Sequence, residues 1–171
     1  MSGFSNYFRY KLLSEKGGWW VDTDVICLKP FNIPDPLVIC SEEVNPLGEG
    51  NTHVGSCVIK APAGNILTKD AFQICMNKKP EDLVWGEIGP RLVKEMVEKY
   101  NMQSFIKEPS WFCPIPGCLW TAFLDGSIEL NFKEDTHAVH LWNEMWRRGG
   151  ADKDEDYPSN SFYEKLKRRY L

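Results

Sequence analysis

The chain of 171 residues is long enough for one domain with a substantial hydrophobic core. Its 20 basic and 24 acidic residues leave a net charge of −4, which argues against a binder of phosphate backbones, so no nucleic-acid partner is expected. The apolar runs are all shorter than the ~18 residues that a membrane-spanning helix needs, so no membrane span is expected in this chain.

The six cysteines show no CxxC spacing. Cys27, Cys40 and Cys57 lie in apolar runs, where a free thiol behaves as a small hydrophobic group. We therefore expect reduced thiols and a cytoplasmic chain by default. The secretory pathway remains the alternative if a membrane anchor precedes this segment in a longer protein.

The first predicted element is a helix, because apolar side chains recur at helical spacing over residues 4–13. Gly17-Gly18 should end it, since glycine adopts the left-handed conformation of a helix C-cap at little cost. Residues 19–21 then predict a short buried strand that stops at Asp22-Thr23-Asp24. Residues 25–28 predict a second extended segment.

The remainder of the chain alternates between predicted strands and predicted helices. Strands are expected at 37–40, 56–59, 104–106, 127–132 and 138–141, and helices at 65–76, from Pro90 onward and at 161–170, the last opening with a Ser161 to Glu164 capping box. This alternation predicts an α/β domain with a mixed sheet, and no linker signal divides residues 1–171.

Asp22-Thr23-Asp24 is the main candidate for chemistry. In an extended segment, residues i and i+2 point to the same side, so both carboxylates could face one cation. Magnesium and manganese prefer such oxygen ligands. An acidic pair between two apolar runs is costly unless something compensates its charge, which favours a metal site over a solvated turn.

Three sequence blocks resemble the glycosyltransferase sugar-binding region family that contains the DXD motif. The first block, Phe4 to Phe31, includes GGWWVDTDVICLKPF. Gly86 to Pro90 resembles the family's Gly-Pro helix start, and Ala138 to Trp146 resembles its late histidine and tryptophan block. The resemblance covers roughly residues 4–147. Relatives in this family include yeast-type outer-chain mannosyltransferases, α-1,4-galactosyltransferases and bacterial capsular polysaccharide glycosyltransferases.

The resemblance implies a glycosyltransferase A-type, Rossmann-like fold with a mixed sheet flanked by helices. It implies a UDP- or GDP-sugar donor, a glycan, lipid or protein acceptor, and a divalent metal, Mn²⁺ foremost with Mg²⁺ as the alternative. By this resemblance Asp24 ligates the metal directly, Asp22 contacts the donor and reaches the metal through water, and His140 completes the metal site.

The same resemblance assigns the donor-binding residues. Arg9 would reach the donor sugar or diphosphate, since a guanidinium suits bidentate oxygen contacts. Trp20 would lie near the ribose or base, and Trp146 would hold the leaving diphosphate. Asn6 stands where many relatives have aspartate, so it can bond a ribose hydroxyl without bringing charge.

Family members carry a strand–helix–strand region before this first helix, whereas only residues 1–3 precede it here. We therefore expect an N-terminally incomplete catalytic domain. The expected function is metal-dependent, retaining transfer of a sugar from a nucleotide-diphosphate donor. The alternative is a non-catalytic remnant that binds nucleotide sugar or glycan.

The residue that assists the chemistry is not identified by sequence. Glu42, Glu43 and Glu87 are candidate carboxylates, but their spacing selects none of them. The family is discussed in terms of front-face attack, in which the leaving phosphate takes the acceptor's proton. A phosphotransferase with a nucleophilic aspartate is a third hypothesis, and Val25-Ile26-Cys27 after the acidic pair fits it poorly.

Overall fold

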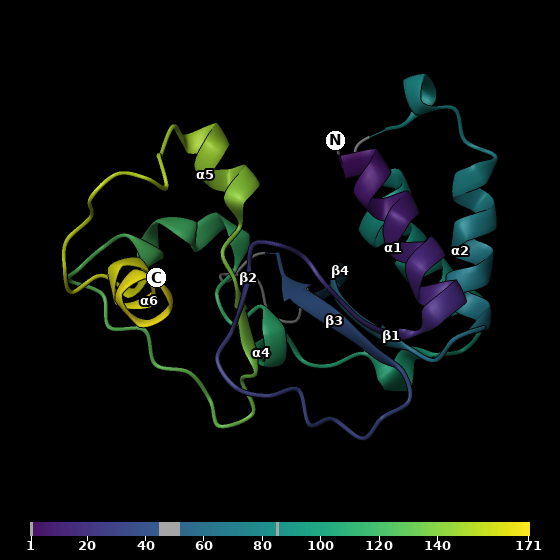
Figure 1. Cartoon of the computed structure of the whole chain (residues 1–171), viewed down its shortest axis with the longest axis horizontal. Coiled ribbons are helices and arrows are strands. Elements are labelled where there is room, and N and C mark those ends of the chain that lie inside the picture. The colour runs from purple at the N-terminus through teal and green to yellow at the C-terminus, as the bar shows by residue number, and fades with distance from the viewer. Residues whose placement is uncertain (1, 45–51, 85) are drawn as a thin grey trace.

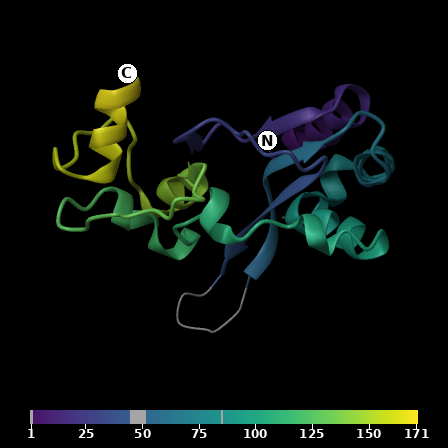
Figure 2. The ribbon, with the colours of Figure 1, turned by 90° about the horizontal axis from the view of Figure 1, so that it is seen from below.

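The computed structural model describes residues 2–44, 52–84 and 86–171. The strands are β1 (Gly18–Val21), β2 (Val25–Cys27), β3 (Val38–Glu43), β4 (Thr52–Ala61) and β5 (Ala138–His140). The helices are α1 (Ser2–Lys16), α2 (Ile66–Met76), α3 (Leu92–Lys99), α4 (Pro109–Phe112), α5 (Asn143–Gly149) and α6 (Phe162–Tyr170). Figures 1 and 2 show α1 and α6 towards opposite ends of the long axis, with the strands between them.

The larger sheet has three antiparallel strands in the order β1-β4-β3. β4 is central because Ile59 pairs with Trp20 of β1 on one side and with Ile39 of β3 on the other. Its middle is apolar, and Val58 and Ile59 are fully buried.

The expected single mixed sheet is a wrong prediction for the described residues. β2 and β5 instead form a separate antiparallel pair in which Val25 lies opposite His140. The predicted strand 104–106 is a 3₁₀ turn over Gln103–Phe105, followed by one parallel bridge from Ile106 to Ile39. Among the described residues, this bridge is the one parallel β-pairing, and both sheets are antiparallel. Fold class is thus α/β with small antiparallel sheets.

Helices α1, α2 and α3 pack together against the larger sheet, and Figure 1 shows α1 and α2 side by side. The apolar face predicted for the helix after Pro90 is confirmed, because Leu92, Val93, Met96 and Val97 are all buried. Buried Tyr10 anchors α1 by donating its hydroxyl to the carbonyl of Ile88 at 3.0 Å. This hydrogen bond connects α1 to the segment that precedes α3.

Gly17 and Gly18 end α1 as predicted. Both have positive φ, at +67° and +92°. At Gly17 a side chain is also sterically excluded, since an added Cβ would lie 2.4 Å from the backbone nitrogen of Ala63. This tight turn directs the chain from α1 into β1 and towards the acidic pair.

The C-terminal part packs around a second group of apolar side chains, which includes Phe123, Val139 and Trp146. Ser161 caps α6 by accepting from the backbone N–H of Glu164 at 3.2 Å, which confirms one half of the predicted capping box. The other half is not formed, because the Glu164 carboxylate accepts from the backbone N–H of Tyr157 at 3.3 Å. The predicted strand 127–132 is irregular instead, because its apolar side chains pack against α6 rather than pairing in a ladder.

All six cysteines are free thiols, as expected. Cys40 and Cys57 are buried, but Cys27 is exposed at the end of β2, contrary to the hydrophobic role predicted for it. Among the described residues, no helix combines the length and apolar character that crossing a bilayer requires.

Candidate functional site

The acidic pair lies in the turn between β1 and β2. The N–H of Val25 donates to the carbonyl of Asp22 at 3.1 Å, and the N–H of Asp22 donates to the carbonyl of Cys57 at 2.8 Å. The segment is therefore a turn, and the extended conformation predicted for Asp22 and Asp24 is wrong. Both carboxylates nevertheless line the same cavity.

Asp22 is held from the α1 side by two buried or half-buried donors. Arg9 Nη2 donates to Asp22 Oδ1 at 2.8 Å, and Trp20 Nε1 donates to the same oxygen at 2.6 Å. The guanidinium also donates to Asn6 Oδ1 at 2.7 Å and lies 5.1 Å from the centre of the Trp20 ring. Because Arg9 is only 2% exposed, this network fixes the orientation of one carboxylate.

Asp24 is held from the opposite side by residues of β5 and α5. His140 Nε2 lies 3.2 Å from Asp24 Oδ2, and the backbone N–H of Asn143 donates to the same oxygen at 3.1 Å. Burial raises the pKa of Asp24, but the hydrogen bond and positive charge of His140 outweigh it and hold this pKa below its ordinary value. Asp24 is therefore an anion at neutral pH.

The pKa of His140 responds to the same contact. Burial lowers this pKa, and the hydrogen bond to Asp24 together with the charges of Asp24 and Asp22 more than compensates, so that the pKa lies above its ordinary value. The result is an ion pair at the wall of the cavity, formed between residues 116 positions apart in sequence.

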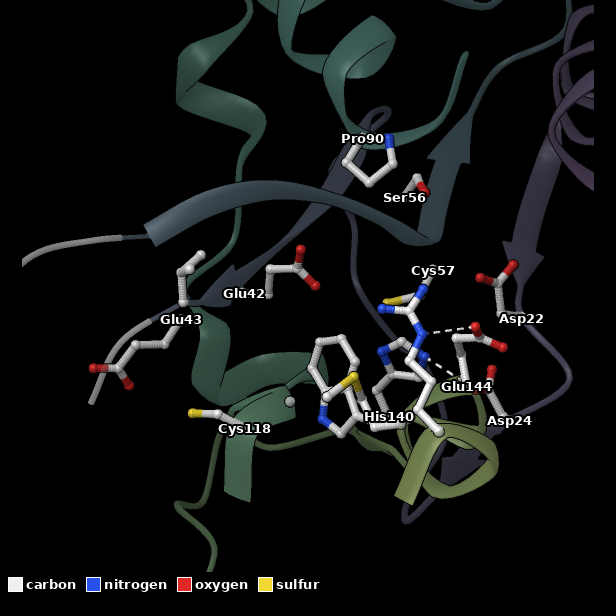
Figure 3. A pocket seen from close by; sticks show the side chains of 15 residues that line it. Asp22, Asp24, Glu42, Glu43, Ser56, Cys57, Pro90, Cys118, His140 and Glu144 are labelled. Atoms are coloured by element: carbon white, nitrogen blue, oxygen red, sulfur yellow. Dashed lines mark hydrogen bonds and ion pairs between the residues drawn. The ribbon is translucent and has the colours of Figure 1, made fainter. Parts of the chain in front are cut away.

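The cavity has a volume of about 340 Å³ and opens between the two sheets (Figure 3). Its lining includes carboxylates, thiols and apolar side chains. The lining residues are Asp22, Asp24, Glu42, Glu43, Val44, Ser56, Cys57, Pro90, Gly117, Cys118, His140, Trp142, Glu144, Met145 and Arg148. Acidic side chains with an apolar floor form an arrangement that suits a cation and an organic ligand together.

The structure distinguishes Glu42 from the other two candidate carboxylates, Glu43 and Glu87. In the view of Figure 3 it faces the cavity across from Asp22. Burial raises its pKa to about 7, with the Cys40 side chain adding to the effect and His140 opposing it. Glu43 lines the same cavity, whereas Glu87 forms a surface ion pair with Lys78 at 2.5 Å.

Four residues predicted to touch the donor do not line this cavity. Arg9 and Trp20 donate hydrogen bonds to Asp22, and Asn6 accepts one from Arg9. Trp146 is placed in the C-terminal hydrophobic cluster, 2% exposed, next to Trp120 and Tyr163. Trp146 faces the protein interior from α5, so its position does not support the predicted contact with a diphosphate.

Trp142 lines the cavity although no site role was predicted for it from the sequence. It lies on the cavity wall, its ring centre is 4.0 Å from that of His140, and its Nε1 donates to the carbonyl of Ile115 at 2.8 Å. Its backbone has φ +60°, which is unusual for a bulky residue. The only available signal in the sequence was its position two residues after His140.

The oxygen donors fit a hard divalent cation. The contacts of Arg9, Trp20, His140 and Asn143 all use Asp22 Oδ1 or Asp24 Oδ2. Asp22 Oδ2 and Asp24 Oδ1 are outside these contacts, and the two side chains keep 26% and 18% of their surface exposed. Two oriented carboxylates beside an open cavity match the ligand preference of Mn²⁺ and Mg²⁺.

One protein family matches the N-terminal part of the chain. Residues 2–48 match the family model of the glycosyltransferase sugar-binding region containing the DXD motif. The matched segment includes Arg9, Asp22 and Asp24, and indicates a glycosyltransferase-related function for this part of the chain. The resemblance of residues 86–90 and 138–146 to the same family lies outside the match and stays a prediction, as do the narrower relatives.

Proposed function

We propose that this chain carries the donor site of a metal-dependent glycosyltransferase that uses a nucleoside-diphosphate sugar. One observation carries the proposal: the acidic pair of the matched segment and the distant His140 meet at one cavity that also contains Glu42 and Trp142. The two carboxylates would supply the metal ligands, and the remaining volume would accommodate part of the donor.

Asp24 and Asp22 are the residues that would hold the cation, through the oxygens not used in the protein contacts. When bound, the metal supplies charge neutralisation to the departing nucleoside diphosphate. Arg9 and Trp20 orient Asp22, and His140 orients Asp24, so these three act as positioning residues. This preorganisation lowers the reorganisation required when charge develops in the transition state.

Glu42 and Trp142 define the reacting side of the proposed site. Ionised Glu42 would stabilise positive charge at the anomeric carbon, and the Trp142 ring would provide a face for the sugar or base. We expect the retaining outcome that the sequence resemblance implies: the bond to the leaving phosphate breaks, the acceptor oxygen bonds the same face, and its proton leaves with the phosphate. The anomeric configuration of the product, read by NMR, tests this outcome.

Calorimetric titration of UDP and GDP into the full chain, with and without Mn²⁺, tests the donor site. We expect manganese-dependent binding that is weakened at least ~30-fold in Asp24→Asn and Asp22→Asn, since each change removes one anionic ligand. Asp70→Asn is the matched control, because Asp70 also forms an ion pair, with Lys99, but lies outside the cavity.

Two results would redirect the proposal. Absence of nucleotide binding by folded wild-type protein would overturn the donor site. Manganese-dependent binding without sugar transfer or donor hydrolysis would support the alternative of a non-catalytic nucleotide-sugar-binding remnant. Mg²⁺ in place of Mn²⁺ tests the choice of metal in the same assay.

A further inference from the structure

Three cysteines that are distant in sequence meet beside the acidic cavity. Cys40 comes from β3, Cys57 from β4, and Cys113 directly follows α4. The Sγ atoms of Cys40 and Cys57 are 3.5 Å apart, and so are those of Cys57 and Cys113. All three side chains are at most 3% exposed. Packing of thiols as small apolar groups would account for their burial alone.

His140 turns the thiol cluster into a candidate site. Its Nε2 faces Asp24 at 3.2 Å, whereas its Nδ1 is buried without a hydrogen-bond partner among the described residues. A ring nitrogen of His140 and the sulfurs of Cys57 and Cys113 all lie within 4.8 Å of one another. A buried imidazole nitrogen without a partner is unfavourable, so apolar packing leaves this atom unexplained.

The spacing fits tetrahedral coordination of a thiophilic cation. Zinc binds thiolate sulfur at about 2.3 Å and imidazole nitrogen at about 2.0 Å, which places neighbouring sulfur ligands roughly 3.7 Å apart. The observed Sγ contacts of 3.5 Å are close to that value. Sulfur and imidazole ligands favour zinc-class ions, whereas Mn²⁺ and Mg²⁺ prefer oxygen ligands. The thiol cluster and the acidic pair would therefore bind different cations.

We propose that Cys57, Cys113 and His140 bind a zinc-class cation at a second site, with Cys40 packed beside Cys57 and outside this set of three ligands. Cys57 and His140 both line the cavity, which gives the ion a route inward.

Asp24 would then serve as the outer carboxylate of the ligating histidine. Metal-binding histidines commonly donate their other ring N–H to a carboxylate, which fixes the tautomer and the ring orientation. The contact between His140 and Asp24 has this form, with Nε2–H donating, and the cation would displace the Nδ1 proton of His140 on binding. The same tautomer serves the proposed donor site, because Asp24 keeps its other oxygen. The second site does not depend on glycosyl transfer.

Cobalt(II) titration of the reduced full chain tests the site directly. We expect one equivalent of Co²⁺ to produce a near-ultraviolet thiolate charge-transfer band and intense visible bands typical of tetrahedral coordination, both abolished by added Zn²⁺. Cys57→Ser and Cys113→Ser should lose the charge-transfer intensity or weaken binding at least ~100-fold. Cys75→Ser is the matched control, a buried thiol on α2 outside the cluster, and should keep both bands.

X-ray absorption of zinc-loaded wild-type protein keeps the test decisive if a cysteine variant fails to fold. At least two sulfur neighbours at about 2.3 Å would support the site. A shell of oxygen and nitrogen alone, or a folded reduced wild type without a thiolate band, would overturn it. Asp22→Asn separates the two proposals, because it should weaken nucleotide binding and leave the cobalt–thiolate band in place.

Discussion

At the residue scale, the Arg9–Asp22 pair determines the orientation of one predicted metal ligand. Arg9 is 3% exposed in its side chain and Asp22 is 26% exposed, so the pair is only partly screened by solvent. Removing one member leaves the other without its principal partner, which is more costly than never having the pair. The sequence resemblance suggested a donor contact for Arg9; in the structure Arg9 contacts Asp22 and does not line the cavity.

We predict that Arg9→Met destabilises the protein by about 2–4 kcal/mol in chemical unfolding, because it leaves the Asp22 carboxylate with Trp20 as its remaining side-chain donor. Lys94→Met is the matched control, since Lys94 and Glu98 form an exposed ion pair whose loss should change stability by less than ~0.5 kcal/mol. Equal effects of the two substitutions would contradict a special role for the buried guanidinium.

Glu42 gives the second prediction at this scale. Its pKa is raised from 4.5 to about 7 in the folded protein, so its contribution to stability is fully present below pH 4.5 and is lost as pH rises through 7. Glu42→Gln should therefore be about 1–3 kcal/mol more stable than wild type at pH 8 and close to it at pH 5. Urea unfolding at the two pH values measures this difference.

Glu42→Gln, which should stabilise the protein at pH 8, should lower the rate of sugar transfer. If ionised Glu42 stabilises charge at the anomeric carbon, kcat of wild type rises with pH through about 7, and Glu42→Gln lowers kcat at least ~10-fold and removes this limb of the profile. Glu43→Gln serves as the control, because Glu43 lines the cavity next to Glu42. An unchanged pH profile in Glu42→Gln would remove Glu42 from the proposed chemistry.

At the element scale, the turn from α1 to β1 decides where the acidic pair lies. Gly17 has φ +67°, and a Cβ there would lie 2.4 Å from the nitrogen of Ala63. Gly18 has φ +92°, and a Cβ there would meet no atom within 4 Å. The two glycines therefore share backbone strain on substitution but differ in steric clash.

We predict that Gly17→Ala destabilises the protein by more than ~2 kcal/mol, whereas Gly18→Ala costs about 1 kcal/mol from the positive φ alone. Thermal unfolding of the two variants measures the difference. If both substitutions have the same effect, the close approach of α1's end to residue Ala63 does not contribute to stability.

The elements also show what local pattern can predict. The helix face at Leu92 to Val97, the cap at Ser161 and the glycine stop after α1 were correct because each depends on neighbours within one or two turns. The strands predicted at 104–106 and 127–132 were wrong, because their apolar side chains pack against other elements without forming a ladder. Pairing partners, not local sequence, decide such segments.

At the scale of the whole molecule, the contact between Asp24 and His140 connects the turn between β1 and β2 to β5 in the C-terminal part of the chain. The contribution of this contact to the free energy of unfolding should depend on pH in the metal-free protein. The lowered pKa of Asp24 contributes stability above pH 3.8 that is lost as pH falls through the folded value. The raised pKa of His140 contributes stability below pH 6.5 that is lost as pH rises through the folded value.

The difference in unfolding free energy between wild type and His140→Gln should therefore be largest between about pH 4 and 6.5 and should shrink above neutrality. Chemical unfolding across this range in the presence of a chelator measures it. His53→Gln is the control, since His53 is an exposed residue of β4. A difference that grows with rising pH would contradict the ion pair.

Sequence alone determined the place of the acidic pair between two short strands, the first helix and its glycine end, because these depend on residues close together in the chain; the turn that the pair adopts was not predicted. It also pointed to His140, through a resemblance and not through spacing. Only tertiary structure decided that Arg9 supports Asp22 from behind, that Glu42 and Trp142 face the cavity, and that Trp146 lies in the core. The cluster of Cys40, Cys57 and Cys113 was likewise invisible in sequence, since separations of 17 and 56 residues carry no local signal, and packing of β3, β4 and α4 brings the sulfurs together.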